Sequence, residues 1–362
     1  MKVLLTTDTL GGVWTFALEL TRVLARRDVD VALATMGRAL DAAQRDEARR
    51  SGALALYASD YVLEWMNEPW ADLECAGEWL LRVADEVEPD VVHLSSYGHA
   101  ALPWRAPVVV TGHSCVLSWF EAVRGEPAPA SWDRYRQLVE RGLQAADAVT
   151  APTQAMLRAL ERHYRFDGPR SVVPNGRSPN SFAPRAKEPF VFAAGRLWDD
   201  AKNVIGLDAV AASLPWPVRV AGDLSGPDGA RRWPRNLDLA GRLPARQLAE
   251  TYARASIFAA PARYEPFGLA PLEAALSGCA LVLGDIPSLH EVWGGAALYV
   301  DPDSRKALET ALVCLIDEPA LRRALGAAAL QRARTFTPER TAAAYLELYQ
   351  RLLATPREQE AA

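Results

Sequence analysis

The feature that most constrains the fold is a repeated alternation of short apolar segments with longer amphipathic ones. Between the short segments, stretches such as residues 13–27, 70–87, 132–145 and 154–164 have apolar positions at helical spacing. Apolar strands that alternate with helices indicate a parallel sheet covered on both faces. In the first half of the chain, the strand-length apolar segments are residues 2–7, 29–36, 53–58, 91–95, 107–111 and 148–151.

The alternation stops once, at residues 171–189, and then restarts. Four prolines in this segment give it the composition of a linker. We therefore expect an N-terminal Rossmann-like domain at residues 1–180, a linker at 181–189 and a C-terminal Rossmann-like domain at 190–336. The strands expected in the second domain are residues 190–194, 218–221, 237–240, 256–260, 280–283 and 298–300.

Residues 337–362 are expected to form a helix that returns to the N-terminal domain. Thr337 is a suitable N-cap, and Pro338 suits the first turn of that helix. The fold class is therefore α/β, with two doubly wound domains. Because ligands of such sheets bind beyond the carboxyl ends of the strands, we expect the domains to face each other across a cleft that holds the site.

Composition and charge argue against several classes of protein. The chain has 362 residues and a net charge of −5, so nucleic acid is not an expected partner, and the basic cluster at residues 231–235 is interpreted as an exposed loop. The sequence has no run of 18 apolar residues, so no membrane-spanning segment is predicted. Without CxxC spacing, the cysteines predict buried free thiols in a reducing cytoplasm rather than metal ligands. They are Cys75, Cys115, Cys279 and Cys314.

One candidate site lies at residues 264–278, where an apolar strand passes through a Pro/Gly loop into a short helix. Pro271 suits the first turn of this helix, and Gly278 suits the position just past its end. The first backbone N–H groups of a helix, together with its dipole, favour an anion. With Glu265 in the loop and Glu273 on the helix, this segment predicts a ligand that carries hydroxyl groups and a phosphate.

A second candidate is the pair of cations Arg196 and Lys202. Gly195 and Arg196 end the first strand of the second domain, and Lys202 precedes the next helix. Cations are disfavoured near a helix N-terminus unless an anion joins them. The pair therefore suits a diphosphate, and a pair of surface cations is the alternative.

Weaker signals lie at other turns. Gly11 and Gly12 follow the first strand, where glycine lets backbone approach a ligand, but a tight structural turn explains them equally well. His113 ends another strand and can bond either a sugar hydroxyl or a backbone carbonyl. The remaining histidines are interpreted as structural or solvent-exposed: His93, His99, His163 and His290.

Taken together, these segments resemble the retaining GT-B glycosyltransferases of family 4 (glycosyl transferases group 1) along nearly the whole chain. Glu265 and Glu273 form the E-x7-E pattern of that family within Glu-Pro-Phe-Gly-Leu. Other matching segments are residues 173–176, 195–197, 259–261 and 301–302.

The sequence departs from the usual family pattern at four places. Asn203 stands where Gly often follows the Lys, and Ser178 where Asp commonly follows Asn-Gly. Ala262 replaces the frequent Ser after Pro261, and Leu224-Ser225 disturbs the usual Gly-x-Gly.

The resemblance implies a role for each matching residue. Glu273 would hold ribose hydroxyls, and Arg196 with Lys202 would hold the diphosphate. Glu265 and the backbone of Phe267, Gly268 and Leu269 would hold the donor sugar. From the first domain, Gly12 would approach the phosphate and His113 would bond the sugar. The loop at Arg242 and Leu243 would meet the base.

The activity implied is transfer of a sugar from a nucleotide-diphosphate donor to an acceptor hydroxyl, with retention of configuration and without metal or other cofactor. The acceptor, a glycan, lipid-linked or small molecule, is not specified by these residues. Arg158, Arg162 and Arg165 leave weak peripheral membrane contact open beside a plain solvated face. Two alternatives also stay open at this point, a sugar-nucleotide epimerase of the same architecture and a non-catalytic nucleotide-sugar binding protein. A Rossmann dehydrogenase is disfavoured because the G-x-G-x-x-G fingerprint is missing.

Overall fold

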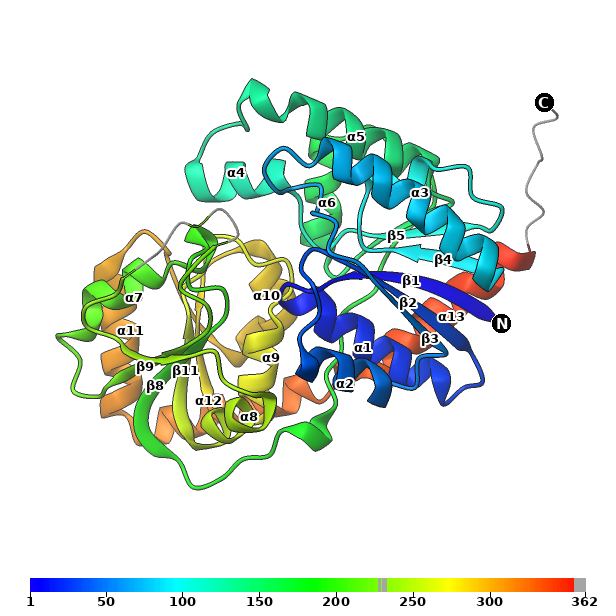
Figure 1. Cartoon of the computed structure of the whole chain (residues 1–362). Helices are drawn as coiled ribbons and strands as arrows, with labels where there is room; N and C mark the ends of the chain where they lie inside the picture. Colours follow the sequence, from blue (N-terminus) through cyan, green and yellow to red (C-terminus); the bar gives the residue numbers. More distant parts are fainter. Residues whose placement is uncertain (227–228, 230–232, 355–362) are drawn as a thin grey trace. The chain divides into compact units, whose positions relative to one another are not determined.

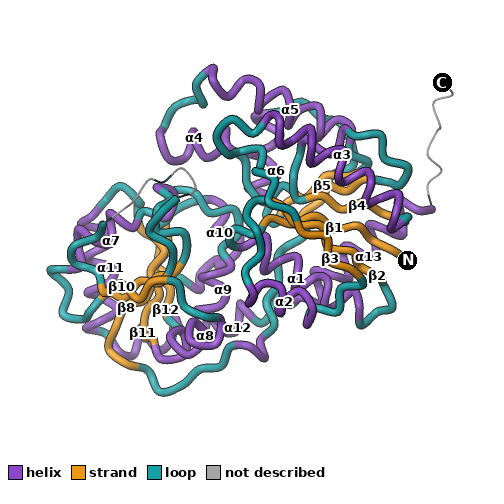
Figure 2. Tube along the Cα trace, in the orientation of Figure 1, coloured by secondary structure: helices purple, strands orange, loops and turns teal. Residues whose placement is uncertain are grey.

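The computed structural model describes residues 1–226, 229 and 233–354. Arg231 and Arg232 of the basic cluster, and residues 355–362 of the expected C-terminal segment, lie outside this description. Contacts divide the chain into two α/β units, and in each unit strands lie side by side with helices around them (Figures 1 and 2). The first unit comprises Met1–Ser118, Ala128–Gly176 and the chain from Pro338, and the second comprises Trp119–Pro127 and Arg177–Thr337.

The first unit is built on a seven-stranded parallel sheet in the order β3-β2-β1-β4-β5-β6-β7. This order is doubly wound, with its topological switch point between β1 and β4. Interior strands such as β4 are buried along their whole length, as near-continuous apolar sequence predicts. The strands are β1 (Lys2–Asp8), β2 (Asp30–Met36), β3 (Ala55–Ala58), β4 (Val91–Leu94), β5 (Val108–Thr111), β6 (Ala148–Ala151) and β7 (Arg170–Val172).

The last helix of the chain completes the core of the first unit. Its residues Tyr345, Leu348 and Tyr349 are buried in one cluster with Phe16 of the first helix and Val3 of β1. The helices described for this unit are α1 (Gly12–Ala25), α2 (Ala42–Arg50), α3 (Trp70–Val87), α4 (Val116–Arg124), α5 (Asp133–Ala145), α6 (Gln154–His163) and α13 (Pro338–Ala354), of which α4 continues into the second unit.

The second unit repeats the arrangement with a six-stranded parallel sheet in the order β10-β9-β8-β11-β12-β13. Its switch point therefore lies between β8 and β11. The strands are β8 (Glu188–Ala194), β9 (Val218–Ala221), β10 (Asp238–Gly241), β11 (Ala255–Ala260), β12 (Ala280–Gly284) and β13 (Leu298–Val300). The helices are α7 (Val204–Ala211), α8 (Ala245–Arg254), α9 (Leu269–Leu276), α10 (Pro287–Trp293), α11 (Arg305–Asp317) and α12 (Pro319–Ala333).

The expected linker at residues 181–189 is instead part of the second unit. Phe182 is buried in the core of that unit, and the Lys187 ammonium donates to the Ser277 carbonyl at 2.7 Å. The division of the chain falls between Gly176 and Arg177. Proline content marked a segment without regular structure, but it could not show that the segment packs against one unit.

Residues Trp119–Pro127 were also expected in the first unit, and they belong to the second. The Trp119 indole N–H donates to Asp199 at 3.1 Å, and Arg124 pairs with Asp200 at 2.9 Å. These long-range contacts leave no trace in local periodicity, so the sequence did not predict them.

The cysteines are free thiols, but the prediction that all are buried was wrong, because Cys75 on α3 is exposed. Among the described helices, none combines the length and apolar content required to cross a membrane.

Candidate active site

The loop that joins β11 to α9 has proline and glycine at the positions predicted for the two ends of the helix. Gly268 precedes the helix with a φ of +91°, a conformation that favours glycine. Pro271 lies in the first turn. Gly278 follows the helix with a φ of +78°, and N–H groups of Gly278 and Cys279 bond the carbonyls of Ala275 and Ala274. This is a Schellman motif, so both ends of α9 are fixed by local sequence.

Lys202 and Glu265 are brought together at the carboxyl edge of the second sheet. The Lys202 ammonium donates to the Glu265 carboxylate at 2.5 Å, across 63 positions of sequence. Their side chains are 22% and 16% exposed. The Ser288 hydroxyl donates to the backbone carbonyl of Glu265 at 2.6 Å, which fixes the loop. A half-buried cation and carboxylate in contact are both still reachable by a ligand.

Arg196 lies in the turn after β8, beside the same switch point. Its guanidinium contacts Asp199 at 2.9 Å, and its Nε is buried without a hydrogen-bond partner among the described residues. Burial alone would raise the pKa of Asp199, but the charges of Arg196 and Lys202 together hold this pKa below its usual value. The turn is tightly packed, since a Cβ on Gly222 would lie 1.8 Å from the Gly195 carbonyl oxygen. Arg196 therefore has one buried donor without a described partner, in a tightly packed turn.

Asn203 shows why this sequence can depart from the usual glycine. Its φ is +54°, and after glycine this conformation suits asparagine best. The side-chain amide donates to the carbonyls of Pro261 and Pro302 at 3.0 and 2.7 Å, and its oxygen accepts from Arg263 at 2.8 Å. Asn203 thus ties the Lys202 turn to the loop after β11.

Glu273 has a partner that the sequence did not predict. Its carboxylate accepts from Nε of Arg177 at 2.7 Å, and the two side chains are 10% and 18% exposed. The Tyr252 hydroxyl is buried nearby, and its pKa is raised by burial and by the negative charge of Glu273. The only hint in the sequence was that Arg177 directly follows the Asn-Gly turn.

The remaining donor-side residues lie in the second unit with different exposures. Phe267 is buried, and its ring packs edge-on against Phe336. Leu269 is half-buried at the start of α9. Arg242 is exposed, and Leu243 packs at the edge of the core after Gly241, whose φ is +65°.

Gly12 and His113 belong to the first unit. Gly11 precedes α1 with a φ of +95°, and Gly12 is exposed as the first residue of that helix. Nε2 of His113 is buried without a partner among the described residues, and the ring packs edge-on against Phe16 at 4.7 Å. Burial lowers the pKa of His113 to about 3, so its imidazole is neutral at pH 7.

The other histidines have structural partners or lie at the surface. His93 is completely buried, and its two ring nitrogens bond Tyr349 and Thr111 at 2.6 Å each. His99 bonds Ser96 at 3.0 Å. His290 bonds Asp285 at 2.6 Å. Within the described ranges, no three His, Cys, Asp or Glu side chains are grouped as metal ligands.

Comparison with known proteins agrees with the fold and identifies the family. Residues 10–180 match the model of Glycosyltransferase Family 4, and residues 177–332 match that of Glycosyl transferases group 1. The chain is similar to D-inositol 3-phosphate glycosyltransferases from Corynebacterium glutamicum (29% identity over 69% of this chain and 68% of the relative) and Kineococcus radiotolerans (30%, 68% and 67%).

Solved structures show the same fold. Sucrose-phosphate synthase from Thermosynechococcus elongatus has a TM-score of 0.81 at 19% identity, and covers 98% of this chain and 99% of its own. Anabaena HepE in complex with UDP-glucose has a TM-score of 0.77 at 17% identity, and covers 97% and 100%. The chain belongs to the GT-B glycosyltransferases, in the group with family 4 and group 1 domains. The predicted family, fold class and enzyme class are thereby confirmed.

Proposed function

We propose that the protein transfers a sugar from a nucleotide-diphosphate sugar to an acceptor hydroxyl, with retention of configuration and without a metal ion. The observation that carries the proposal is the contact of Lys202 with Glu265 beside the start of α9, in the same unit as Arg196. At one edge of the second sheet, Arg196 and Lys202 could then bind a diphosphate, and Glu265 could accept hydrogen bonds from sugar hydroxyls. HepE, a relative in fold, is described in complex with UDP-glucose, which supports this class of donor.

In this proposal, Arg196 and Lys202 stabilise the negative charge that develops on the leaving diphosphate, a role that a metal ion fills in other enzymes. Glu265 and the backbone at Phe267–Leu269 orient the donor sugar, and Glu273 holds the ribose. Gly12 and neutral His113 would contribute from the first unit, and Arg242 with Leu243 would meet the base. The uncharged imidazole of His113 could donate a hydrogen bond to the sugar without adding charge.

The proposed step is a substitution on one face of the anomeric carbon. The bond from this carbon to the phosphate oxygen breaks, the acceptor oxygen forms a new bond on the same face, and the acceptor proton moves to the leaving phosphate oxygen. No protein nucleophile is needed, which fits the absence of a nucleophile and base pair among the residues assigned to the site.

The first experiment is a thermal-shift screen of uridine, guanosine, adenosine and thymidine diphosphates. We expect one of them to raise Tm through binding to the folded state. The sugar esters of that nucleotide are then tested for hydrolysis and transfer, with and without EDTA, and proton NMR reports the anomeric configuration of the product. Inverted product or loss of activity in EDTA would contradict the mechanism, and isomerised donor without transfer would identify an epimerase.

A further inference from the structure

The second half of α4 is joined at two points to the turn that carries Lys202. The Trp119 indole N–H donates to Oδ1 of Asp199 at 3.1 Å, and the Arg124 guanidinium pairs with Asp200 at 2.9 Å. The Arg124 guanidinium also lies 5.2 Å from the centre of the Trp119 ring. We call Trp119 and Arg124 the α4 clamp. All four residues of these two bonds belong to the second unit, although the partners are 80 and 76 positions apart in the sequence.

Asp199 connects the α4 clamp to Arg196. Its side chain is 6% exposed, and its two carboxylate oxygens have separate partners. Oδ1 accepts from the Trp119 indole and from the Ala201 amide at 3.0 Å, whereas Oδ2 accepts from the Arg196 guanidinium at 2.9 Å. Two donors on Oδ1 restrict rotation of the carboxylate, so Oδ2 stays directed at the guanidinium.

Arg196 depends on this carboxylate for its orientation. The Arg196 side chain is 40% exposed, so without a partner it would sample several rotamers. The ring of Trp198 lies 5.6 Å from the guanidinium carbon, and such a contact leaves the guanidinium free to turn in its own plane. A hydrogen bond to a fixed oxygen removes that freedom. Although burial raises the pKa of Asp199, neighbouring cations and hydrogen bonds lower it below its usual value, so the carboxylate is charged at pH 7.

Attachment of α4 to the second unit does not by itself explain the bond from Trp119. The pair of Arg124 with Asp200 joins the same two segments, with side chains that are 47% and 18% exposed. The Trp119 bond ends instead on the more deeply buried carboxylate, the one that already binds Arg196. Its effect therefore reaches a residue of the candidate site.

We propose that Trp119 is a positioning residue for the donor diphosphate and that it acts through Asp199 on Arg196. The proposal rests on the proposed function, since it assumes that Arg196 binds a diphosphate. A guanidinium that is oriented before the ligand arrives loses less side-chain entropy when it binds phosphate oxygens. The role of Trp119 is indirect and requires no contact with the ligand.

The test is the affinity of the full chain for uridine, guanosine, adenosine and thymidine diphosphates, measured by titration calorimetry. Trp119→Phe removes the N–H group and keeps an aromatic ring at a half-buried position, so the variant should fold. The nucleoside diphosphate that binds the unaltered chain best should bind Trp119→Phe more weakly by about threefold or more. Unchanged affinity in Trp119→Phe would overturn the proposal.

A double-mutant cycle shows whether Trp119 acts through Arg196. In the Arg196→Ala background, Trp119→Phe should cause no further loss of affinity. The same loss in both backgrounds would mean that the indole acts by another route, and the proposal would be wrong.

Two control variants separate the bond to Asp199 from attachment of α4. Arg124→Met removes the other contact of the α4 clamp and should leave the affinity within about twofold, because an exposed ion pair contributes little. Trp233→Phe, at a tryptophan that is 69% exposed, should change nothing. A loss in Arg124→Met as large as that in Trp119→Phe would show that attachment of α4, rather than the orientation of Asp199, controls binding, and would refute the proposal.

The indole N–H resonance of Trp119 gives a second readout, which packing alone would not move. In protein that contains isotope-labelled tryptophan, this resonance is identified by its loss in Trp119→Phe. A saturating concentration of the nucleoside diphosphate should shift it in the unaltered chain and not in Arg196→Ala. A resonance that does not respond in the unaltered chain would contradict the coupling of Trp119 to the site.

Failure of this inference is distinguishable from failure of the proposed function. If no nucleoside diphosphate binds the unaltered chain, the proposed function is wrong, and this inference is overturned with it. If one binds and Arg196→Ala weakens it while Trp119→Phe does not, the role of Trp119 is wrong and the transferase proposal stands.

Discussion

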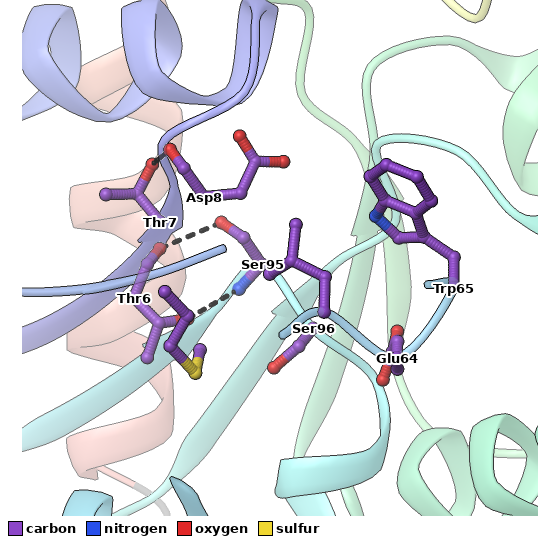
Figure 3. A pocket seen from close by; sticks show the side chains of 9 residues that line it. Thr6, Thr7, Asp8, Glu64, Trp65, Ser95 and Ser96 are labelled. Atoms are coloured by element: carbon purple, nitrogen blue, oxygen red, sulfur yellow. Dashed lines mark hydrogen bonds between the residues drawn. The ribbon is translucent and has the colours of Figure 1, made fainter. Parts of the chain in front are cut away.

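The two units have the same strand order around their switch points and different charged side chains at that position. In the second unit, Arg196 and Lys202 lie beside the switch between β8 and β11, each paired with a carboxylate. In the first unit, the carboxylates of Asp8 and Glu64 are among the groups that line a small pocket at the switch between β1 and β4 (Figure 3). The same topology thus places a switch point in each unit, and the loop residues at each switch point decide which kind of ligand could bind there.

The comparison also separates two ways to stabilise a buried carboxylate. Glu273 in the second unit pairs with a guanidinium, whereas the hydrogen bonds described for Glu64 in the first unit come from backbone amides. Burial raises the pKa of Glu64, and the amides of Gly98 and Tyr97 oppose that increase. A carboxylate held by amides has no opposite charge in its described bonds, whereas one held by arginine is paired with a cation.

The largest expected effect tests the cationic side of this comparison. Arg196→Ala should lower kcat/KM by roughly 10²–10³-fold because a donor aimed at developing charge is lost. Steady-state kinetics with the donor identified by the nucleotide screen measure this. Arg246→Ala removes an exposed arginine paired with Glu250 in the same unit and serves as the control. If Arg196→Ala retained full activity while Tm stayed normal, the diphosphate role would be wrong.

Arg177→Met tests the arginine-held carboxylate. Because Arg177 and Glu273 are only 18% and 10% exposed, loss of the cation leaves a nearly buried charge and should cost about 3 kcal/mol of unfolding free energy. Urea denaturation measures the cost. Glu273→Gln in the same chain should recover much of it, because the unpaired charge is then removed. A double variant as unstable as Arg177→Met would show that packing of Arg177 on Phe182, rather than charge, dominates.

The pH dependence of stability should differ between the units. Burial, with a smaller contribution from His113, lowers the folded-state pKa of His93 from 6.5 to about 3. The unfolded chain therefore binds more protons between these values, and stability falls as pH drops below 6.5. From pH 7 to pH 5, His93 alone should cost about 2 kcal/mol.

Hydrogen exchange, corrected for the intrinsic effect of pH, measures this cost in peptides of each unit. The first unit also contains buried His99 and His113, whose pKa values are likewise lowered by burial. In the second unit, the histidine His290 is exposed. Protection should therefore fall more in the first unit, and an equal loss in both units would contradict the prediction.

The smallest effect concerns the turn that carries Lys202. Asn203→Ala keeps a φ of +54°, which is unfavourable for alanine, and removes three side-chain hydrogen bonds. We expect a loss of about 2 kcal/mol. Asn203→Gly relieves the backbone and should cost about 1 kcal/mol, from the lost bonds alone. Equal losses in thermal or urea unfolding would show that backbone conformation is unimportant here.

Strands and helix ends could be predicted because their signals, apolar runs and capping residues, lie within a few positions of the sequence. Apolar segments predicted the described strands except β7, which has three residues and begins with an exposed arginine. Gly278 was placed correctly after α9 because a left-handed residue commonly ends a helix there. The pairing of Lys202 with Glu265 required tertiary structure, although both residues had been selected as site candidates. Arg177 and Glu64 were missed because each lies in a loop without periodicity, and their meaning comes from distant partners.

The position of α13 has a consequence for how the protein is made. Tyr345 and Tyr349 bond Thr111 and His93 inside the first unit, so the core of the unit that is translated first is completed by residues translated after the second unit. On the ribosome, the second unit can bury its own core while the core of the first unit still lacks α13. The first unit is therefore translated first but completed second, because its core stays incomplete until Tyr349 has emerged from the ribosome.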